Sequence, residues 1–278
     1  MTVLTLALLV ACGSFAAGLL GALTGLGGGI VVVPMLTLFF HVDIRYAVGA
    51  SIVSVIATSS GAAAAYVREG YTNVRVGILL EVATTIGALI GAALAGVVPT
   101  SFLAILFGCV LFFTAYRSLK PVPEHQVLAT PDRWAELFRL DSTYPTMQGL
   151  QPYSVQNVPG GFAIMLVAGT LSALLGIGSG IVKVLAMDQM MRLPFKVSTT
   201  TSNFMIGVTA AASAGVYLHE GYIDPAIAFP VMLGVLSGAL LGARVLTRVH
   251  PRGLRQLFTV VVVVMAVQML YKGVRGVV

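Results

Sequence analysis

Charged residues are scarce in this chain. Only 9% of its 278 residues are Asp, Glu, Lys or Arg, whereas 58% are apolar and the mean hydropathy is +0.97. A soluble domain carries about 25% charged residues, so the composition excludes an ordinary soluble globular protein. We therefore predict an all-α polytopic membrane protein, because helices satisfy their own backbone polar groups inside a bilayer.

Cysteines and nucleotide-binding motifs are also nearly absent. Cys12 and Cys109 lie within apolar segments, so neither a disulfide framework nor a metal site is expected. The chain has no Gly-x4-Gly-Lys-Ser/Thr phosphate loop, which excludes nucleotide hydrolysis by this chain itself. We expect no cofactor. The net charge of +6 bears on which loops face the cytoplasm and does not indicate nucleic-acid binding.

Glycine, by contrast, is concentrated at two places. Gly25-Leu26-Gly27-Gly28-Gly29 and Gly176-Ile177-Gly178-Ser179-Gly180, here called the first and second glycine breaks, each interrupt an apolar run. Glycine weakens a helix by about 1 kcal/mol relative to alanine. Inside a bilayer such a break is tolerated only where the freed backbone groups face protein or a wet cavity. We expect a broken membrane segment at each position.

The apolar runs predict the membrane segments, since a span needs about 20 apolar residues. The runs cover residues 3–24, 30–40, 45–67, 75–98 and 101–119, then 160–175, 181–191, 197–218, 226–249 and 254–272. We expect a first transmembrane repeat at residues 1–119, an insert at 120–158 and a second transmembrane repeat at 159–278.

The two halves align without gaps at an offset of 151 residues, which indicates an internal duplication. The matched positions include Gly18 with Gly169, Ser51 with Ser202, and Tyr66-Val-Arg-Glu-Gly-Tyr71 with Tyr217-Leu-His-Glu-Gly-Tyr222. Duplicated halves that are each broken at the same place point to the binding site of a transporter.

Basic residues should collect on the cytoplasmic side of a membrane, which tests how each broken segment crosses. If each crosses once, the two sides hold six and eight basic residues. If each is V-shaped and returns to its starting side, one side holds Arg45, Lys272 and Arg275 and the other holds eleven. The V shape is favoured. We therefore expect two inverted repeats, each a broken V-shaped helix element plus three transmembrane helices, with both termini extracytoplasmic.

The insert then falls on the cytoplasmic side. Residues 132–140 place Trp134, Leu137 and Phe138 at helical spacing, which predicts a short amphipathic helix on the membrane surface. Residues 140–158 are polar and partly alternating, which suggests a small β-hairpin. The insert is either an ordered linker or a regulatory element.

The half-helices that begin at Ile30 and Ile181 predict an anion site. Their free N–H groups and positive dipole ends would converge at the membrane centre and favour a small anion, although the glycines would also permit tight packing. Glycine lets a ligand approach the bare backbone. The expected binding residues of the breaks are Gly27, Gly28, Gly29, Gly178, Ser179 and Gly180.

Hydroxyl-rich segments follow both breaks, at residues 51–60 and 198–203. Ser51, Thr201, Ser202 and Asn203 would replace the hydration shell of an oxyanion. Small polar residues also form hydrogen bonds between membrane helices, and both interpretations stay open.

Several charged residues lie within the predicted spans. An intramembrane lysine indicates a functional site by default, and Lys183 would contact the substrate anion or pair with Asp188. Glu81 and Arg244 are expected near the cytoplasmic face, where snorkelling of the side chains to the membrane surface or an ion pair between them is the simpler explanation. If a carboxylate couples protons to transport, Glu81 and Asp188 are the candidates.

An intramembrane enzyme is the rival class, with Ser179 as nucleophile and His219 or His250 as base. The counterpart of Ser179 in the first half is Gly28, which indicates that the position merely needs a small residue. We therefore expect no enzyme. An anion channel shares every feature named and stays an alternative.

The second glycine break, with Gly-Ile-Gly-Ser-Gly-Ile-Val-Lys within residues 174–187, is followed by Lys-Val-Ser-Thr-Thr-Thr-Ser-Asn-Phe-Met-Ile-Gly at residues 196–207. Together with the first break, these motifs resemble the TauE/SafE family of sulfite exporters over nearly the whole chain. The resemblance implies a secondary transporter in the bacterial cytoplasmic (inner) membrane, in contact with lipid, that exports sulfite or an organosulfonate. An importer of thiosulfate or sulfate is the related alternative.

Overall fold

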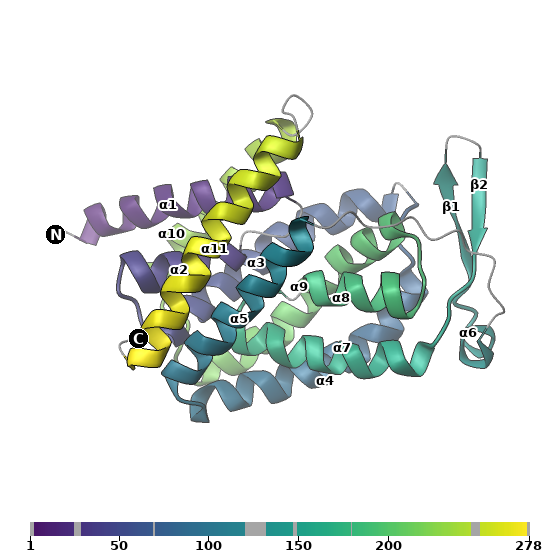
Figure 1. The fold of residues 1–278 in the computed structure, drawn as a ribbon, viewed down its shortest axis with the longest axis horizontal. Helices are drawn as coiled ribbons and strands as arrows, with labels where there is room; N and C mark the ends of the chain where they lie inside the picture. The colour runs from purple at the N-terminus through teal and green to yellow at the C-terminus, as the bar shows by residue number, and fades with distance from the viewer. Residues whose placement is uncertain are drawn as a thin grey trace.

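The computed structural model describes residues 3–24, 29–68, 70–119, 132–146, 149–178, 180–245 and 251–276. The protein is an all-α membrane protein, as predicted (Figure 1). Among the described helices, four are long and apolar enough to cross a membrane by length and composition: α4 (Val74–Val97), α5 (Thr100–Leu119), α7 (Val158–Leu175) and α10 (Pro225–Val245).

The helices of the two halves begin at matching positions. In the first half α1 (Val3–Thr24) is followed by α2 (Gly29–Phe39) and α3 (Ile44–Arg68). In the second half α7 is followed by α8 (Gly180–Leu185), which continues as the π-helical η1 (Ala186–Met190), and then by α9 (Phe195–His219). The first residues of α2 and α8, and of α3 and α9, are each 151 positions apart. The same offset relates α4 to α10 and α5 to α11 (Pro251–Arg275).

The two halves pack against each other through two equivalent pairs of helices. Helix α1 packs against α10 and α7 packs against α4 (Figure 1). A Cβ on Gly87 would collide with the carbonyl oxygen of Leu166, and a Cβ on Gly238 would collide with that of Phe15. Gly87 and Gly238, like Phe15 and Leu166, are 151 positions apart. The two halves are therefore related by an approximate two-fold rotation that swaps these helix pairs.

Matched helices α3 and α9 pack in antiparallel directions. Arg45 at the start of α3 lies over the ring of Tyr222, just past the end of α9, at 5.6 Å from its centroid. Lys196 at the start of α9 lies 5.9 Å from the ring centroid of Tyr71, just past the end of α3. Each helix therefore begins where its counterpart ends.

Each broken segment doubles back on itself. The N–H of Gln156, just before α7, donates a 3.0 Å hydrogen bond to the carbonyl oxygen of Met191, just after η1. In the first half, a Cβ on Gly13 of α1 would lie 2.7 Å from Met35 Sδ of α2. Figure 1 shows α2 running back alongside α1. The helix that follows each glycine break therefore packs back against the helix that precedes the break.

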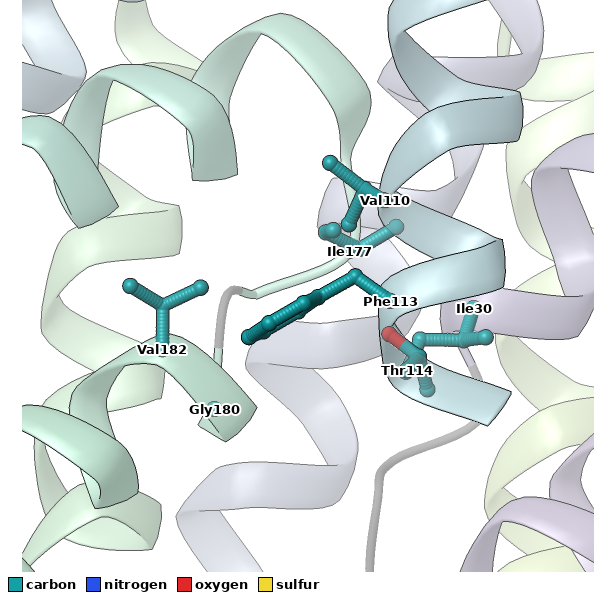
Figure 2. A pocket seen from close by; sticks show the side chains of 7 residues that line it. All are labelled: Ile30, Val110, Phe113, Thr114, Ile177, Gly180 and Val182. Carbon is teal, nitrogen blue, oxygen red and sulfur yellow. The ribbon is translucent and has the colours of Figure 1, made fainter. Parts of the chain in front are cut away.

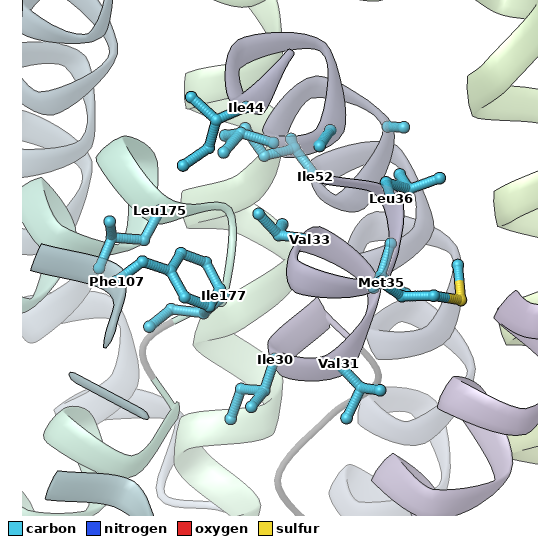
Figure 3. Close-up of a cluster of buried hydrophobic side chains, with 14 of the residues drawn as sticks. Ile30, Val31, Val33, Met35, Leu36, Ile44, Ile52, Phe107, Leu175 and Ile177 are labelled. Atoms are coloured by element: carbon cyan, nitrogen blue, oxygen red, sulfur yellow. The ribbon is translucent and has the colours of Figure 1, made fainter. Parts of the chain in front are cut away.

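A hydrophobic core surrounds α2, which is buried from Gly29 to Leu38. Ile30, Val33 and Leu36 of this helix belong to one cluster of buried apolar side chains with Phe107 of α5 and Ile177 of the second glycine break, and Val33 faces these two residues (Figure 3). Inside a bilayer the lipid tails are as apolar as these side chains, so close van der Waals packing is the main stabilising contribution. The core therefore fixes α2 against the second break.

The insert contains α6 (Arg133–Leu137) and a hairpin of β1 (Ser142–Thr146) and β2 (Gly149–Tyr153), paired antiparallel with Ser142 opposite Tyr153. The helix is shorter than the predicted residues 132–140, because Arg139 adopts a positive φ of 51° that ends it. The hairpin and α6 lie at one end of the helical bundle (Figure 1).

Asn73 attaches the insert to the bundle. Its Nδ2 donates 2.8 Å hydrogen bonds to the Leu140 carbonyl and to the Tyr153 hydroxyl, while its Oδ1 caps α4 by accepting from Val76 N–H. Burial raises the pKa of the Tyr153 hydroxyl, since the ionised form would lose its hydration, and Asn73 partly opposes that effect. One buried amide therefore links the hairpin to the start of α4.

Candidate functional site

The second glycine break contains two left-handed residues. Gly176 ends α7 with φ of 64°, and its N–H donates to the Ser172 carbonyl. Gly178 has φ of 71°. A residue with a Cβ atom is strained at such positive φ values, which explains why glycine occupies both positions. Ser179 of this break, and Gly27 and Gly28 of the first, lie outside the described residues.

The two breaks meet at Gly29 and Gly176. A Cβ on Gly29 would lie 2.9 Å from the carbonyl oxygen of Gly176 and 2.9 Å from Ser51 Oγ. Ser51 itself donates a 2.6 Å hydrogen bond to that carbonyl. The N-terminus of α2, whose first N–H groups have no partner within the helix, therefore lies directly against the second break.

The counterpart of Ser51 also contacts a break. Ser202 Oγ donates a 3.2 Å hydrogen bond to the carbonyl oxygen of Gly180, where α8 begins. Ser51 and Ser202 are both fully buried. Two matched hydroxyls from α3 and α9 therefore lie beside the two half-helix starts.

A small hollow, with room for about one water molecule, lies between these half-helix starts and α5 (Figure 2). Ile30 and Ile177 lie on one side of the hollow, Gly180 and Val182 on the other, and the ring of Phe113 extends across from α5 (Figure 2). Val110 and Thr114 of α5 complete the lining. Most of the lining side chains are apolar, so a polar ligand would depend on backbone N–H groups and on the Thr114 hydroxyl.

The other predicted polar residues lie at different places. Thr201 is buried, but its Oγ1 accepts a 3.0 Å hydrogen bond from the N–H of Asn73 and so holds the α3–α4 loop. Asn203 is half-buried on α9. Asp188 is buried on η1, close to the end of the returning segment. The contacts thus bring Ser51 and Ser202 to the breaks but direct Thr201 to the α3–α4 loop.

Lys183 forms an ion pair that we did not anticipate. It is 0% exposed, and its Nζ lies 3.9 Å from Glu81 Oε2 of α4. We had considered Asp188 as partner for Lys183 and Arg244 as partner for Glu81; the side chain of Arg244 lies outside the described residues. The ion pair joins α8 of the second half to α4 of the first.

Thr209 bridges this pair and was missed from the sequence. Lys183 Nζ donates to Thr209 Oγ1, which donates a 2.6 Å hydrogen bond to Glu81 Oε1. Thr85 Oγ1 donates a weaker 3.3 Å bond to the same Glu81 oxygen. Thr209 lies two helical turns after Ser202 and therefore on the same face of α9, a spacing that would have indicated it.

No group of three or more His, Cys, Asp or Glu that could hold a metal ion is found within the part of the chain that the structure describes. Among the described residues, the arrangement offers backbone N–H groups, hydroxyls and the buried Lys183–Glu81 pair. Backbone N–H groups and hydroxyls can donate hydrogen bonds to an anion.

Known proteins resemble this chain over almost its full length. A family model described as sulfite exporter TauE/SafE matches residues 9–269. The probable membrane transporter protein YunE of Bacillus subtilis (strain 168) is 26% identical over 265 residues, which cover 93% of this chain and 95% of the relative. The probable membrane transporter protein YdhB of the same organism is 28% identical and covers 83% and 86%.

A relative from an archaeon is similar to the same extent. The probable membrane transporter protein MJ0441 of Methanocaldococcus jannaschii is 25% identical over 282 residues, which cover 96% of each chain. No solved structure matches the chain significantly.

Proposed function

Since the chain belongs to the sulfite exporter TauE/SafE family of membrane transporters, we propose that it is a secondary transporter that exports a small sulfur-containing oxyanion. Sulfite or an organosulfonate is the proposed substrate. Transport proceeds by alternating access around one site where the two glycine breaks meet.

The meeting of Gly29 and Gly176 is the observation that carries this proposal. Helix α2 directs its first N–H groups and its positive dipole end toward that point, and both favour an anion. The Ser51 and Ser202 hydroxyls lie beside it. Hydroxyls and backbone N–H groups replace the hydration shell of an oxyanion without adding a fixed charge, which suits an ion that must also leave.

Alternating access in this proposal depends on two halves of opposite orientation in the membrane. Three observations support inverted repeats: the antiparallel packing of α3 with α9, the return of each broken segment to its starting end, and the bias of basic residues. In α5 and α11, a Cβ on Gly273 would contact Ile105 and one on Gly108 would contact Leu270, so these matched helices are antiparallel as well.

From the same arrangement we propose a membrane topology. Three full crossings and one returning segment per half place both termini outside the cytoplasm and the insert, residues 120–158, inside it. For a bacterial protein the membrane would be the cytoplasmic (inner) membrane.

The test is flux of labelled sulfite, sulfate, thiosulfate and taurine into and out of liposomes that contain the purified protein. We expect saturable sulfite or sulfonate flux, reduced in Gly178→Ala, because the φ of 71° at Gly178 strains any residue with a side chain. Gly215→Ala is the control, because a Cβ there has open space.

Other results would identify the alternatives. Current that rises with potential and does not saturate would indicate an anion channel. Preference for thiosulfate or sulfate would indicate a transporter of those anions. Absence of flux of every one of these anions would overturn the proposed function.

A further inference from the structure

The buried ion pair between the halves has no charged counterpart at the matched positions. The position that corresponds to Lys183 of α8 is Val32 of α2, and the position that corresponds to Glu81 of α4 is Met232 of α10. The matched positions of α2 and α10 therefore carry no charge. Buried charges are costly, and inside a membrane they mark functional positions. The pair needs an explanation other than packing.

The two oxygens of Glu81 have different surroundings. Oε1 accepts hydrogen bonds from Thr209 and Thr85. Oε2 lies 3.9 Å from Lys183 Nζ and, among the described residues, has no hydrogen-bond donor. Burying a carboxylate oxygen without a hydrogen-bond donor costs free energy. A proton bound to Oε2 would remove the negative charge from an atom that nothing else stabilises by a hydrogen bond.

The pair is connected to the glycine breaks by two helices. Lys183 is on α8, three residues after Gly180, and therefore on the same face of that helix as the break. Thr209 is on α9, on the same face as Ser202, whose hydroxyl contacts the Gly180 carbonyl. An anion at the breaks would add a negative charge near a pair whose net charge is zero. Neutralising Glu81 would leave Lys183 to balance the anion.

Other titratable groups on the helices that surround the ion pair lie farther along those helices from Glu81, Lys183 and Thr209. Helix α7 has none. On α9, Lys196, Tyr217 and His219 are more than two turns from Thr209. On α4, Arg75 is more than one and a half turns from Glu81 and donates to the Arg139 carbonyl. Asp188 is on η1, five residues beyond Lys183. Lys183 is the charged group in contact with Glu81.

We propose that Glu81 is a proton-binding site that couples proton movement to anion movement. One proton from the aqueous phase forms an O–H bond with Oε2 when an anion binds at the breaks, and it leaves with the anion on the other side. Lys183 holds the positive charge throughout. This inference rests on the proposed function and adds to it a stoichiometry of one proton per anion in the same direction.

The test uses the full-length protein in liposomes with a trapped pH dye and with the membrane potential held at zero. Labelled methanesulfonate, a permanent monoanion, and labelled sulfite are measured in parallel under an imposed pH gradient. One pH unit corresponds to about tenfold in an equilibrium ratio. The wild type should therefore accumulate a monoanion about tenfold toward the alkaline side.

Glu81→Gln resembles the protonated carboxyl group and should still exchange labelled for unlabelled anion. It should no longer respond to the pH gradient, and its proton-to-anion ratio should fall by one for whichever anion is carried. Glu136→Gln, which changes an exposed carboxylate on α6, should behave as the wild type. Because the variants and the wild type are compared at the same pH, the protons that sulfite itself carries contribute equally to both. That contribution cancels from the difference between their proton-to-anion ratios.

Three results would overturn the proposal: pH-independent flux in the wild type, a pH response retained in Glu81→Gln, or loss of anion exchange in Glu81→Gln. Absence of saturable exchange of both anions in the wild type would instead reject the proposed function, so the two failures are distinguishable.

Discussion

Ser51 of α3 donates a 2.6 Å hydrogen bond to the carbonyl oxygen of Gly176, where α7 ends. The bond crosses between the two halves, over 125 positions of sequence. It joins a hydroxyl-rich helix of the first repeat to the glycine break of the second, at the point where α2 begins. The proposed anion site is therefore assembled from both repeats.

Replacing Ser51 by alanine should weaken anion binding. The change leaves the buried Gly176 carbonyl without its donor, and a typical hydrogen bond contributes about 0.5–1.5 kcal/mol. We expect the KM for the transported anion to rise about three- to tenfold. Ser54→Ala is the matched control, because Ser54 is equally buried but donates within its own helix to the Ser51 carbonyl. Equal KM values for the two variants would contradict the assignment.

Gly87 and Gly238 should be equally intolerant of a methyl group. Each lies against a backbone carbonyl of the other half, at α4–α7 and α10–α1. Overpacking of this kind costs about 1–3 kcal/mol, so alanine at either position should lower the midpoint of thermal unfolding in detergent. Gly215→Ala meets open space and should be neutral or stabilising by up to about 1 kcal/mol. Tolerance at Gly238 but not at Gly87 would argue against the exchanged packing.

Asn73→Ala should release the insert. The variant loses two hydrogen bonds to the insert and the side-chain cap of α4, and loss of such a cap alone costs about 0.5–2 kcal/mol. We expect faster trypsin cleavage after Arg133 and Arg139, both exposed. Gln151→Ala removes only an exposed hydrogen bond from Tyr144 and should leave the rate unchanged. Identical cleavage of both variants would show that Asn73 does not hold the insert.

Much of the fold could be predicted because its signals are local or repeated. Glycine density located the ends of α1 and α7 and the starts of α2 and α8. The repeat alignment predicted which helices correspond. In each case the residues that carry the information are neighbours in sequence or occupy matched positions.

Contacts between the halves could not be predicted in this way. Glu81 and Lys183 occupy positions whose counterparts are apolar, so the repeat alignment gives no reason to pair them. Thr201 carries a hydroxyl like the serines beside the breaks, yet the rotation of α9 turns it toward Asn73. Phe113 gave no signal, because an aromatic residue in an apolar span is ordinary. These features depend on how the helices pack.

A reporter that is active only outside the cytoplasm tests the topology. Fused after Val278, it should be active, since three crossings and one returning segment per half place that terminus outside. Inserted at the hairpin between Thr146 and Gly149, it should be inactive. Activity at both positions, or at neither, would contradict a V-shaped segment in each half.

Counterflow of labelled sulfite tests alternating access at the shared site most directly. Liposomes with the protein are loaded with unlabelled sulfite and diluted into labelled sulfite at zero potential, and chloride-loaded liposomes are the control. We expect label to rise transiently above its equilibrium level only in the sulfite-loaded liposomes, because a carrier returns loaded from each side. Label that rises only to equilibrium, at the same rate in both, would contradict the account.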